Sequence, residues 1–515
     1  MKNVLLLSIF CLPAVLFAFA GGDGSVGNPY QIQTPADLTA VNNNLTAHYI
    51  LVSDINMVAN SSLKAIIAPD TGSSSDYTFS GTPFSGTFDG NGHKISNLAL
   101  GTVASSANDY IGLFGKLNGA SVTNLVLDNF SVKGNHYTAV LAGYSNAASI
   151  SDCAIIDSDL NAKTGSTYVG LLTGIEADCT ISGCSVSDGL LTVTDCSYCS
   201  FMAGYALRGT ILNCSAEGTA YLGNSTDEFG AIVGYVYNSS LILCKAVSVI
   251  TAGESCWYIG GVAGQADYAN VGACMAAGRI NADDGSMYLG GLVGYIYYGS
   301  YNSCFANTYI QTNYQCQSIG GFAGKIAYGP VNNSYCVGGI NTDYLSDDIG
   351  GFTGQLFSSD ISHSYSSVAI VYDQYTSSIG GFTAEVLGSS TVDQCFWDTQ
   401  VSGLASSTTG TGASTVQMKD DTLFLNAGWD FIEEEANGLD DYWYMRNFVY
   451  PRLDWQPQPG DINANGLIDS EDAILMAAQW LEDVDDFETF AADIDMSGFV
   501  DYVDLSVLAN NRSAL

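Results

Sequence analysis

The chain has 515 residues, and its 14 basic against 52 acidic residues give a formal net charge of −38. A surface of this sign argues against nucleic acid and anionic membranes as partners. Charged residues make up only 13% of the chain, which contains 57 Gly and 31 Tyr. The surface is therefore expected to consist largely of small polar side chains and turns.

Residues 1–20 have the layout of a secretion signal. Lys2 supplies the positive charge, Val4 to Phe17 the apolar core, and Ala18-Phe19-Ala20 a cleavage site of small residues. The apolar run is too short to cross a bilayer, and no later stretch reaches the length that a bilayer requires. We expect a secreted protein, extracellular or associated with a cell surface, without a membrane span.

Residues 21–101 show no regular repeat. They include Asn28-Pro-Tyr-Gln-Ile32 and the segment Phe84 to Ile95. Because the first unit of a stacked protein has an exposed core face that must be covered, we expect this region to form irregular first coils and an N-terminal cap.

Residues 102–398 contain ten copies of a glycine-rich phrase. The tightest copies are Ile259–Gly264, Leu289–Gly294, Ile319–Gly324 and Ile349–Gly354. The ends of successive copies are 28, 31 and then, seven times, 30 residues apart. A fixed period of this size is typical of stacked units that bury their apolar faces against one another.

Each repeat holds three short apolar runs separated by Gly, Asn, Asp and Ser. In one repeat these runs are Ile319–Ile326, Val331–Val337 and Gly339–Tyr344. Glycines in the middle of segments and the lack of a 3.6-residue period argue against helices. We predict an all-β fold, a parallel β-helix or solenoid of about ten 30-residue coils. The crossover rule favours right-handed winding.

Six cysteines follow the same period, each ten residues after the end of a glycine-rich phrase. They are Cys153, Cys184, Cys214, Cys244, Cys274 and Cys304. Stacked coils would place neighbours about 4.8 Å apart, whereas the Cβ atoms of a disulfide lie nearer about 3.8 Å. We therefore predict a buried column of free thiols rather than a disulfide framework. The pair Cys196 and Cys199 is also interpreted as core.

Two further columns are candidates for ligand contact. Tyr205, Tyr235 and Tyr295 directly follow the phrase, at a position that is polar in other repeats, so we expect an outward strip that could contact a glycan. The alternative is ordinary half-exposed strand tyrosine. Asp283, Asn313, Asp343 and Asp373 form the second column, which is interpreted as turn residues, with a calcium or sugar contact or a carboxylate pair for catalysis left open.

No catalytic residues are predicted in the solenoid. Beyond residue 134 its five basic residues fall at five different positions of the repeat, and the four histidines are scattered. A lyase of this fold would need clustered Arg or Lys. The pattern favours a solenoid without catalytic activity.

Residues 399–459 interrupt the repeat with aromatic clusters. Ala427–Phe431, Tyr442–Tyr444 and Tyr450–Trp455 are interpreted as a plug for the C-terminal end of the core, with a sugar-binding platform as the alternative. Pro457 and Pro459 mark a linker.

Residues 460–515 contain two similar loops, each followed by an apolar run of helical character. Calcium prefers six to eight oxygen ligands around a loop with a tight glycine turn and one backbone carbonyl. The oxygen side chains and the carbonyls of Leu467 and Phe499 fit that pattern, so two Ca²⁺ ions are predicted. The ligands are Asp461, Asn463, Asn465, Leu467, Asp469 and Asp472 in the first loop and Asp493, Asp495, Ser497, Phe499, Asp501 and Asp504 in the second.

This EF-hand-like module, with Asp rather than Glu at the twelfth loop position, resembles a type I dockerin. The resemblance implies a cohesin-bearing scaffold or surface protein as the partner. By position, it places the cohesin contacts at Ser470-Glu471 and Tyr502-Val503. Because the two pairs differ, binding in two equivalent orientations is not expected.

The repeats resemble the GLUG repeat of bacterial surface and secreted proteins, which implies a β-solenoid but no reaction. Together the resemblances predict a secreted, adhesin-like solenoid that binds carbohydrate or a cell surface and is tethered by a dockerin. The alternative is a polysaccharide-degrading enzyme, a glycoside hydrolase or lyase, of a cohesin–dockerin complex.

Overall fold

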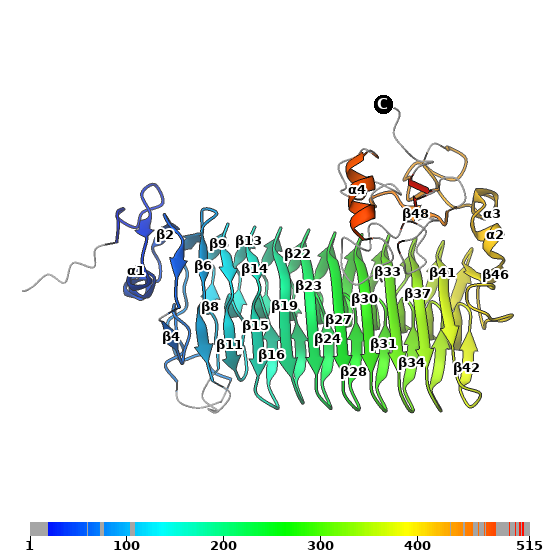
Figure 1. Cartoon of the computed structure of the whole chain (residues 1–515), viewed down its shortest axis with the longest axis horizontal. Helices are drawn as coiled ribbons and strands as arrows, with labels where there is room; N and C mark the ends of the chain where they lie inside the picture. Colours follow the sequence, from blue (N-terminus) through cyan, green and yellow to red (C-terminus); the bar gives the residue numbers. More distant parts are fainter. Residues whose placement is uncertain are drawn as a thin grey trace, which may run out of the picture.

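The structure is a computed structural model. It describes residues 19–58, 60–72, 77–102, 109–432, 434–445 and 449–456, together with 462, 468, 470–479, 494, 500, 504–505 and 507–508 of the C-terminal part. Within these residues the chain forms one elongated β-solenoid of about ten turns, drawn horizontally in Figure 1. The predicted all-β fold is confirmed.

Three parallel sheets run along the solenoid, and over the described residues they contain 21, 17 and 8 strands. Each regular coil contributes to all three, but the predicted apolar runs do not match the sheets one to one. Ile319–Ile326 spans strands of two sheets, and Val331–Val337 and Gly339–Tyr344 share a strand of the third. The 8-stranded sheet is formed by β16 (Thr167–Gly170), β20 (Ser197–Ser200), β24 (Asp227–Gly230), β28 (Trp257–Gly260), β31 (Met287–Gly290), β34 (Gln317–Gly320), β38 (Asp347–Gly350) and β42 (Ser377–Gly380).

The other two sheets carry the surfaces considered below. The central part of the 21-stranded sheet is formed by β21 (Ala203–Leu207), β25 (Val233–Tyr237), β29 (Ala263–Gly272), β32 (Val293–Asn302), β35 (Ala323–Ala327), β36 (Val331–Asn332), β39 (Thr353–Phe357) and β40 (Asp360–Ser362). The central part of the 17-stranded sheet is formed by β19 (Ser185–Val193), β23 (Ser215–Leu222), β27 (Lys245–Ala252), β30 (Met275–Ala282), β33 (Phe305–Thr312), β37 (Tyr335–Thr342) and β41 (Tyr365–Val371).

The 30-residue period of the sequence is the register of the coils. Ile259 pairs with Leu289, which pairs with Ile319 on the next coil, and all are fully buried. The glycines of the phrase have a steric reason. A Cβ on Gly290 would lie 1.9 Å from the carbonyl oxygen of Val293, and one on Gly294 would lie 2.6 Å from the backbone of Gly264 and Ile259. Coils with side chains at these positions could not approach each other.

The predicted cysteine column lies inside the solenoid, and its six thiols are free and buried. Each Sγ reaches a backbone carbonyl one coil back, for example Cys274 to Leu241 at 3.4 Å and Cys304 to Val271 at 3.6 Å. A second column was not predicted from the sequence. In it, thiol and hydroxyl groups alternate, and each contacts a backbone carbonyl of the preceding coil. Cys256, Ser286 and Cys316 each lie 3.3 Å from a carbonyl of the preceding coil.

The N-terminal end is covered by a short helix. The strands β1 (Tyr30–Ile32), β2 (His48–Leu51), β5 (Thr87–Asp89) and β9 (Ser121–Thr123) pair in parallel, one after the other. Between β1 and β2, α1 (Pro35–Ala40) is held by a capping box from Thr34, and its Leu38 is fully buried in the core. The 3₁₀ helix η1 (Val41–Asn43) follows.

The C-terminal aromatic residues do not plug the end of the core, and they do not form an exposed platform. Trp397 and Leu404 belong to the cluster that closes that end. Beyond β46 (Thr411–Ala413), α2 (Thr415–Met418) and α3 (Asp421–Leu425), the chain turns back along the outside of the 17-stranded sheet. We call residues 415–456 the lateral segment (Figure 1).

The lateral segment buries its large side chains against aromatic residues of the coils. Trp429 and Trp443 are fully buried and pack with Phe305, Tyr335 and Tyr365 in one cluster. Hydrogen bonds fix the contact, including Tyr365 Oη to the carbonyl of Pro451 at 2.8 Å. Aromatic content alone predicted burial correctly but not the surface against which it occurs. The antiparallel pair β47 (Trp443–Tyr444) and β48 (Arg452–Leu453) lies within this segment.

Among the described residues, the structure contains no helix that is both long and apolar enough to span a membrane.

Candidate functional site

The predicted tyrosine strip lies on the 21-stranded sheet. Tyr205 on β21 pairs directly with Tyr235 on β25, and Gln265 separates Tyr235 from Tyr295 on β32. The column is therefore real, but its members are half-buried rather than fully outward. Their faces are partly occupied by each other, since Tyr205 and Tyr235 stack with centroids 5.2 Å apart.

A second tyrosine column, which the sequence analysis missed, explains this burial. Its members have left-handed backbone, with φ between 57° and 63°, and each directly precedes the core residue of the glycine-rich phrase. The signal in the sequence was Tyr followed by an apolar residue and, usually, Gly at the same period. In the regular coils its four members are Tyr168, Tyr198, Tyr258 and Tyr288, and the stacked rings of Tyr137 and Tyr110 continue the line toward the N-terminus.

The two columns interlock. The ring of Tyr198 lies 5.6 Å from that of Tyr205 and 5.5 Å from that of Tyr235, and Tyr295 stacks on both Tyr258 and Tyr288. We call these seven residues the tyrosine face. Because the rings cover one another, the edges and hydroxyls of the tyrosines are better placed than the ring faces to contact a ligand.

Two carboxylates lie within the tyrosine face. Glu228 occupies the position between Tyr198 and Tyr258 in the second column. Burial, as the larger cause, and the negative charge of the neighbouring Asp227, as the smaller one, raise the pKa of Glu228 to about 8. Burial also raises the pKa of Asp267, whose carboxylate accepts hydrogen bonds from Gln265 and Tyr235. At neutral pH Glu228 is therefore largely protonated, but the face also holds Asp267 and the ammonium group of Lys325, whose Nζ lies 5.7 and 5.8 Å from the ring centroids of Tyr288 and Tyr295.

The column of Asp283, Asn313, Asp343 and Asp373 forms turns, as predicted. Asn313 Nδ2 donates to Asp283 Oδ1 at 2.9 Å. The carboxylates of Asp343 and Asp373 accept the backbone N–H groups of Tyr344 and Tyr375 at 2.8 and 2.9 Å. These side chains therefore bond within the turns or, for Asn313 and Asp283, between the turns of successive coils.

The histidines are as dispersed in space as in sequence. His93 contacts Asp54 at 3.1 Å, His136 contacts Thr167 at 2.9 Å, and His48 contacts Thr87 at 2.8 Å. Within the described part of the chain, no group of three or more His, Cys, Asp or Glu residues could hold a metal.

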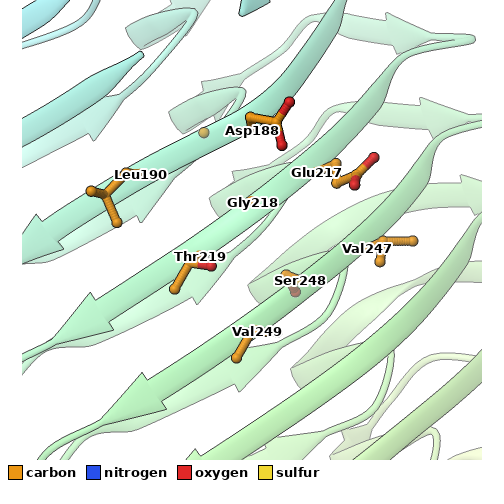
Figure 2. A pocket seen from close by; sticks show the side chains of 9 residues that line it. Asp188, Leu190, Glu217, Gly218, Thr219, Val247, Ser248 and Val249 are labelled. Atoms are coloured by element: carbon orange, nitrogen blue, oxygen red, sulfur yellow. The ribbon is translucent and has the colours of Figure 1, made fainter. Parts of the chain in front are cut away.

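A shallow hollow of about 260 Å³ opens on the 17-stranded sheet (Figure 2). Gly189 and Gly218 provide its floor, and a bulge at Asp188 shifts the register of β19 against β23. Figure 2 shows the carboxyl groups of Asp188 and Glu217 on adjacent strands at one end of the hollow. The sequence analysis did not single out this pair, because the bulge changes the spacing.

The C-terminal module is described only in part. Helix α4 (Ser470–Ala478) follows the first loop, so the backbone of Ser470 and Glu471 opens a helix. The two loop-closing residues, Asp472 and Asp504, are fully buried. The remaining predicted ligands and contacts lie outside the described residues: Asp461, Asn463, Asn465, Leu467, Asp469, Asp493, Asp495, Ser497, Phe499, Asp501, Tyr502 and Val503.

The described atoms fit a cation site. Asp472 Oδ1 accepts the backbone N–H of Ile462 at 2.8 Å, which brings the carboxylate back to the start of its loop. Buried carboxylates need a cation or hydrogen-bond donors as partners, and oxygen atoms are the ligands that Ca²⁺ prefers. Asp472 and Asp504 would hold calcium, which would supply the charge that stabilises both loops.

The lateral segment touches the module. Arg452 Nη2 donates a 2.6 Å hydrogen bond to the carbonyl of Ile494. A small apolar cluster around Ile462, Ile468, Met476, Ile494 and Val500 forms the interior of the module.

Comparison with known proteins gives partial matches. Halomucin of Haloquadratum walsbyi is 36% identical over 137 residues, which is 25% of this chain and 1% of halomucin. A candidate Gly-rich membrane protein of Evansella cellulosilytica is 33% identical over 122 residues, 23% of this chain and 13% of that protein. The chain thus spans only a small part of these curated relatives.

A solved structure, that of a candidate immunoglobulin A1 protease from Bacteroides ovatus, aligns over 84% of this chain and 95% of that chain. Its sequence identity is 12% and its TM-score is 0.28, so the likeness is too weak to support a conclusion about this chain.

The family model of the type I dockerin domain matches residues 459–511. Type I dockerin domains bind calcium and imply a cohesin partner, and proteins that carry them are typically extracellular or attached to a cell surface. The C-terminal residues 459–511 of this chain are a type I dockerin domain.

Proposed function

We propose that this chain is a secreted, non-catalytic β-solenoid that presents its tyrosine face to a polysaccharide or a cell-surface glycan. Its signal segment (residues 1–20) exports it, and its dockerin tethers it to a cohesin-bearing scaffold or surface protein. The repeats of residues 102–398 resemble GLUG repeats of bacterial surface proteins, which agrees with an adhesin-like role.

The stacked row of tyrosines, which presents ring edges and hydroxyls along several coils, is the observation that carries this proposal. Burial keeps Glu228 protonated at neutral pH and raises the pKa of Tyr205 to about 12. A face of neutral hydroxyls and ring edges in a chain of net charge −38 suits an uncharged ligand rich in hydroxyl groups.

Tethering depends on two calcium ions, held by the first-loop ligands from Asp461 to Asp472 and the second-loop ligands from Asp493 to Asp504. Ser470-Glu471 and Tyr502-Val503 would contact the cohesin. These assignments rest on the positions of the residues in the dockerin motif.

The alternative is a glycoside hydrolase. It requires a protonated carboxylic acid and a second carboxylate on the same surface, and Glu228 and Asp267 meet this description better than the turn residues Asp343 and Asp373. Incubation with a polysaccharide panel separates the two functions. Retention without release of reducing sugar supports the binding protein, and release that Glu228→Gln abolishes would establish the enzyme.

A further inference from the structure

A polar cleft of about 540 Å³ lies where the lateral segment meets the coils. One wall is formed by the ends of β32, β36 and β40, with Asn302, Asn332 and His363. The other wall is the loop 428–442, which includes Asp430 and Tyr442. The size is that of small-molecule sites, about 300–1,000 Å³.

The coil wall offers hydrogen-bond donors. Asn302 Oδ1 accepts from Asn333 Nδ2 at 3.1 Å, and Asn332 Oδ1 accepts from Ser362 Oγ at 2.7 Å. These bonds orient both amides through their oxygens. Among the described residues, the amide nitrogens of Asn302 and Asn332 have no acceptor, so both remain available as donors.

The opposite wall offers a fixed acceptor. Asp430 Oδ2 accepts the backbone N–H groups of Asp440 and Asp441 at 3.0 and 3.2 Å. Gly438 permits this approach, since a Cβ there would lie 2.2 Å from Oδ2. The other oxygen, Oδ1, is buried and has no hydrogen-bond partner in the described part of the chain. A buried acceptor without a partner is unfavourable unless a ligand or water supplies a donor.

The charge of the cleft restricts the ligand. Its lining contains Asp430 and Asp440 but neither Lys nor Arg. Burial lowers the pKa of His363, so this side chain is neutral at neutral pH. A phosphate or a uronic acid would find carboxylates and no cation. A neutral polyol, in contrast, can accept from the two amides and donate to the carboxyl groups of the lining, while the half-buried ring of Tyr442 offers apolar surface.

We propose that this cleft binds one end or one unit of a neutral oligosaccharide. The site is separate from the tyrosine face, and it joins two parts of the chain, residues 300–363 and 428–442, that are 65 or more residues apart in sequence. The lateral segment would then do more than cover the coils, because it supplies the acceptor wall of a binding site.

The test is calorimetric titration of the full-length protein with cellohexaose, mannohexaose and xylohexaose, and with hexagalacturonate as the acidic comparison. We expect at least one neutral hexasaccharide to bind and hexagalacturonate to give no heat of binding. Asp430→Asn and Asn332→Ala should each weaken binding by about tenfold or more. Asn281→Ala is the matched control, because this amide lies on β30 outside the cleft, and it should leave the affinity unchanged.

Several outcomes would overturn the proposal. One is the absence of binding by all three neutral hexasaccharides at millimolar concentration. Another is wild-type affinity in both Asp430→Asn and Asn332→Ala. A third is heat from calcium chloride alone that Asp430→Asn removes, because the cleft would then be a cation site. If Tyr→Phe changes on the tyrosine face remove polysaccharide retention while the cleft variants do not, the proposed function stands and the cleft proposal fails.

Discussion

The hydroxyl of Tyr235 donates a 2.7 Å hydrogen bond to Oδ2 of Asp267 on the next coil. Gln265 Nε2 donates to the other oxygen of the same carboxylate at 2.9 Å. The hydroxyl proton of Tyr235 is therefore already used in a hydrogen bond within the protein. The hydroxyls of Tyr205 and Tyr295 make no such bond within the described residues, so these two are the better donors to a ligand.

Replacing Tyr205, Tyr235 and Tyr295 together by Phe tests whether the hydroxyls bind a glycan. The half-buried rings keep their stacking and only the hydrogen bond from Tyr235 to Asp267 is lost, so the melting temperature should fall by a few degrees at most, whereas retention on the polysaccharide should fall several-fold. Alanine is a poorer choice, because loss of stacked rings costs about 1 kcal/mol or more each. The matched control is Phe at Tyr221, Tyr314 and Tyr344, which lie outside this face. Equal retention by both triple variants would contradict a role for the tyrosine face.

Glu176 predicts a pH dependence of stability. Its side chain is fully buried at a core position that the next coil fills with Ala206, and Oε1 accepts the backbone N–H of Cys179 at 2.8 Å. Burial raises its pKa from 4.5 to about 8, with the charges of Asp178 and Arg208 acting in opposite directions.

The carboxyl group of Glu176 binds its proton more tightly in the folded state than in the unfolded state. Its contribution to the free energy of unfolding is therefore greatest below about pH 4.5 and falls as the pH rises toward 8. The loss should amount to a few kcal/mol in the free energy of unfolding. Glu176→Gln should flatten the profile without abolishing it, since Glu228 titrates in the same direction. Denaturant midpoints at several pH values measure this, with exposed Glu254→Gln as control. Parallel profiles for wild type and Glu176→Gln would show that the residue does not carry the effect.

The sequence predicted the stacked coils well because sterics enforce the period. A Cβ on Gly290 or Gly294 would lie within 2.6 Å of backbone atoms, so most coils repeat glycine at both places, with Ser200 and Ala384 as exceptions. Once the period is known, residues that differ by 30, such as Tyr205 and Tyr235, must be neighbours. Features that depend on the repeat alone could therefore be predicted.

Features that depend on local backbone or on distant segments could not. Tyr168 and Tyr198 have positive φ values of 63° and 61°, a conformation that bulky residues rarely adopt. The aromatic residues around Trp429 predicted burial, but nothing in their pattern shows that they return to the outside of the coils. The cleft between Asn332 and Asp430 is a consequence of that return, so it had no sequence signal.

The thiols should be unreactive in the native protein. Cys184, Cys214, Cys244 and Cys274 are buried and free, so a reagent in solution cannot reach their sulfur atoms. Burial raises the pKa of Cys274, whereas hydrogen bonds with neighbouring thiols lower the pKa of Cys184 and Cys244, so it is burial that protects all four. Labelling by iodoacetamide should therefore be low in the folded protein and complete in denaturant. Mass spectrometry of the unreduced protein should find no disulfide within this column. A bond between any two of its members would show that the coils do not stack thiol on carbonyl as described.

Calcium should be required by the dockerin and not by the solenoid. The described interior of the dockerin is one small apolar cluster that includes Ile468, Met476 and Val500, and so small a core needs a metal to fold. The solenoid buries a continuous apolar core of its own. In the full-length protein, EDTA should therefore remove protection from amide exchange in α4 while the main thermal transition stays in place.

Variants at the buried loop ends test the calcium dependence of each loop separately. Asp472→Ala should remove binding of calcium by the first loop, and Asp493→Ala with Asp504→Ala should remove it from the second, so each should lower capture by an immobilised cohesin. Isothermal titration with CaCl₂ counts the ions, for which we expect two in the wild type and one in each loop variant. Glu435→Ala, an exposed acid outside the dockerin, should behave as the wild type. Two ions bound by the Asp472→Ala variant with unchanged affinity would refute the assignment of the first loop, and full cohesin capture in EDTA would refute calcium-dependent tethering altogether.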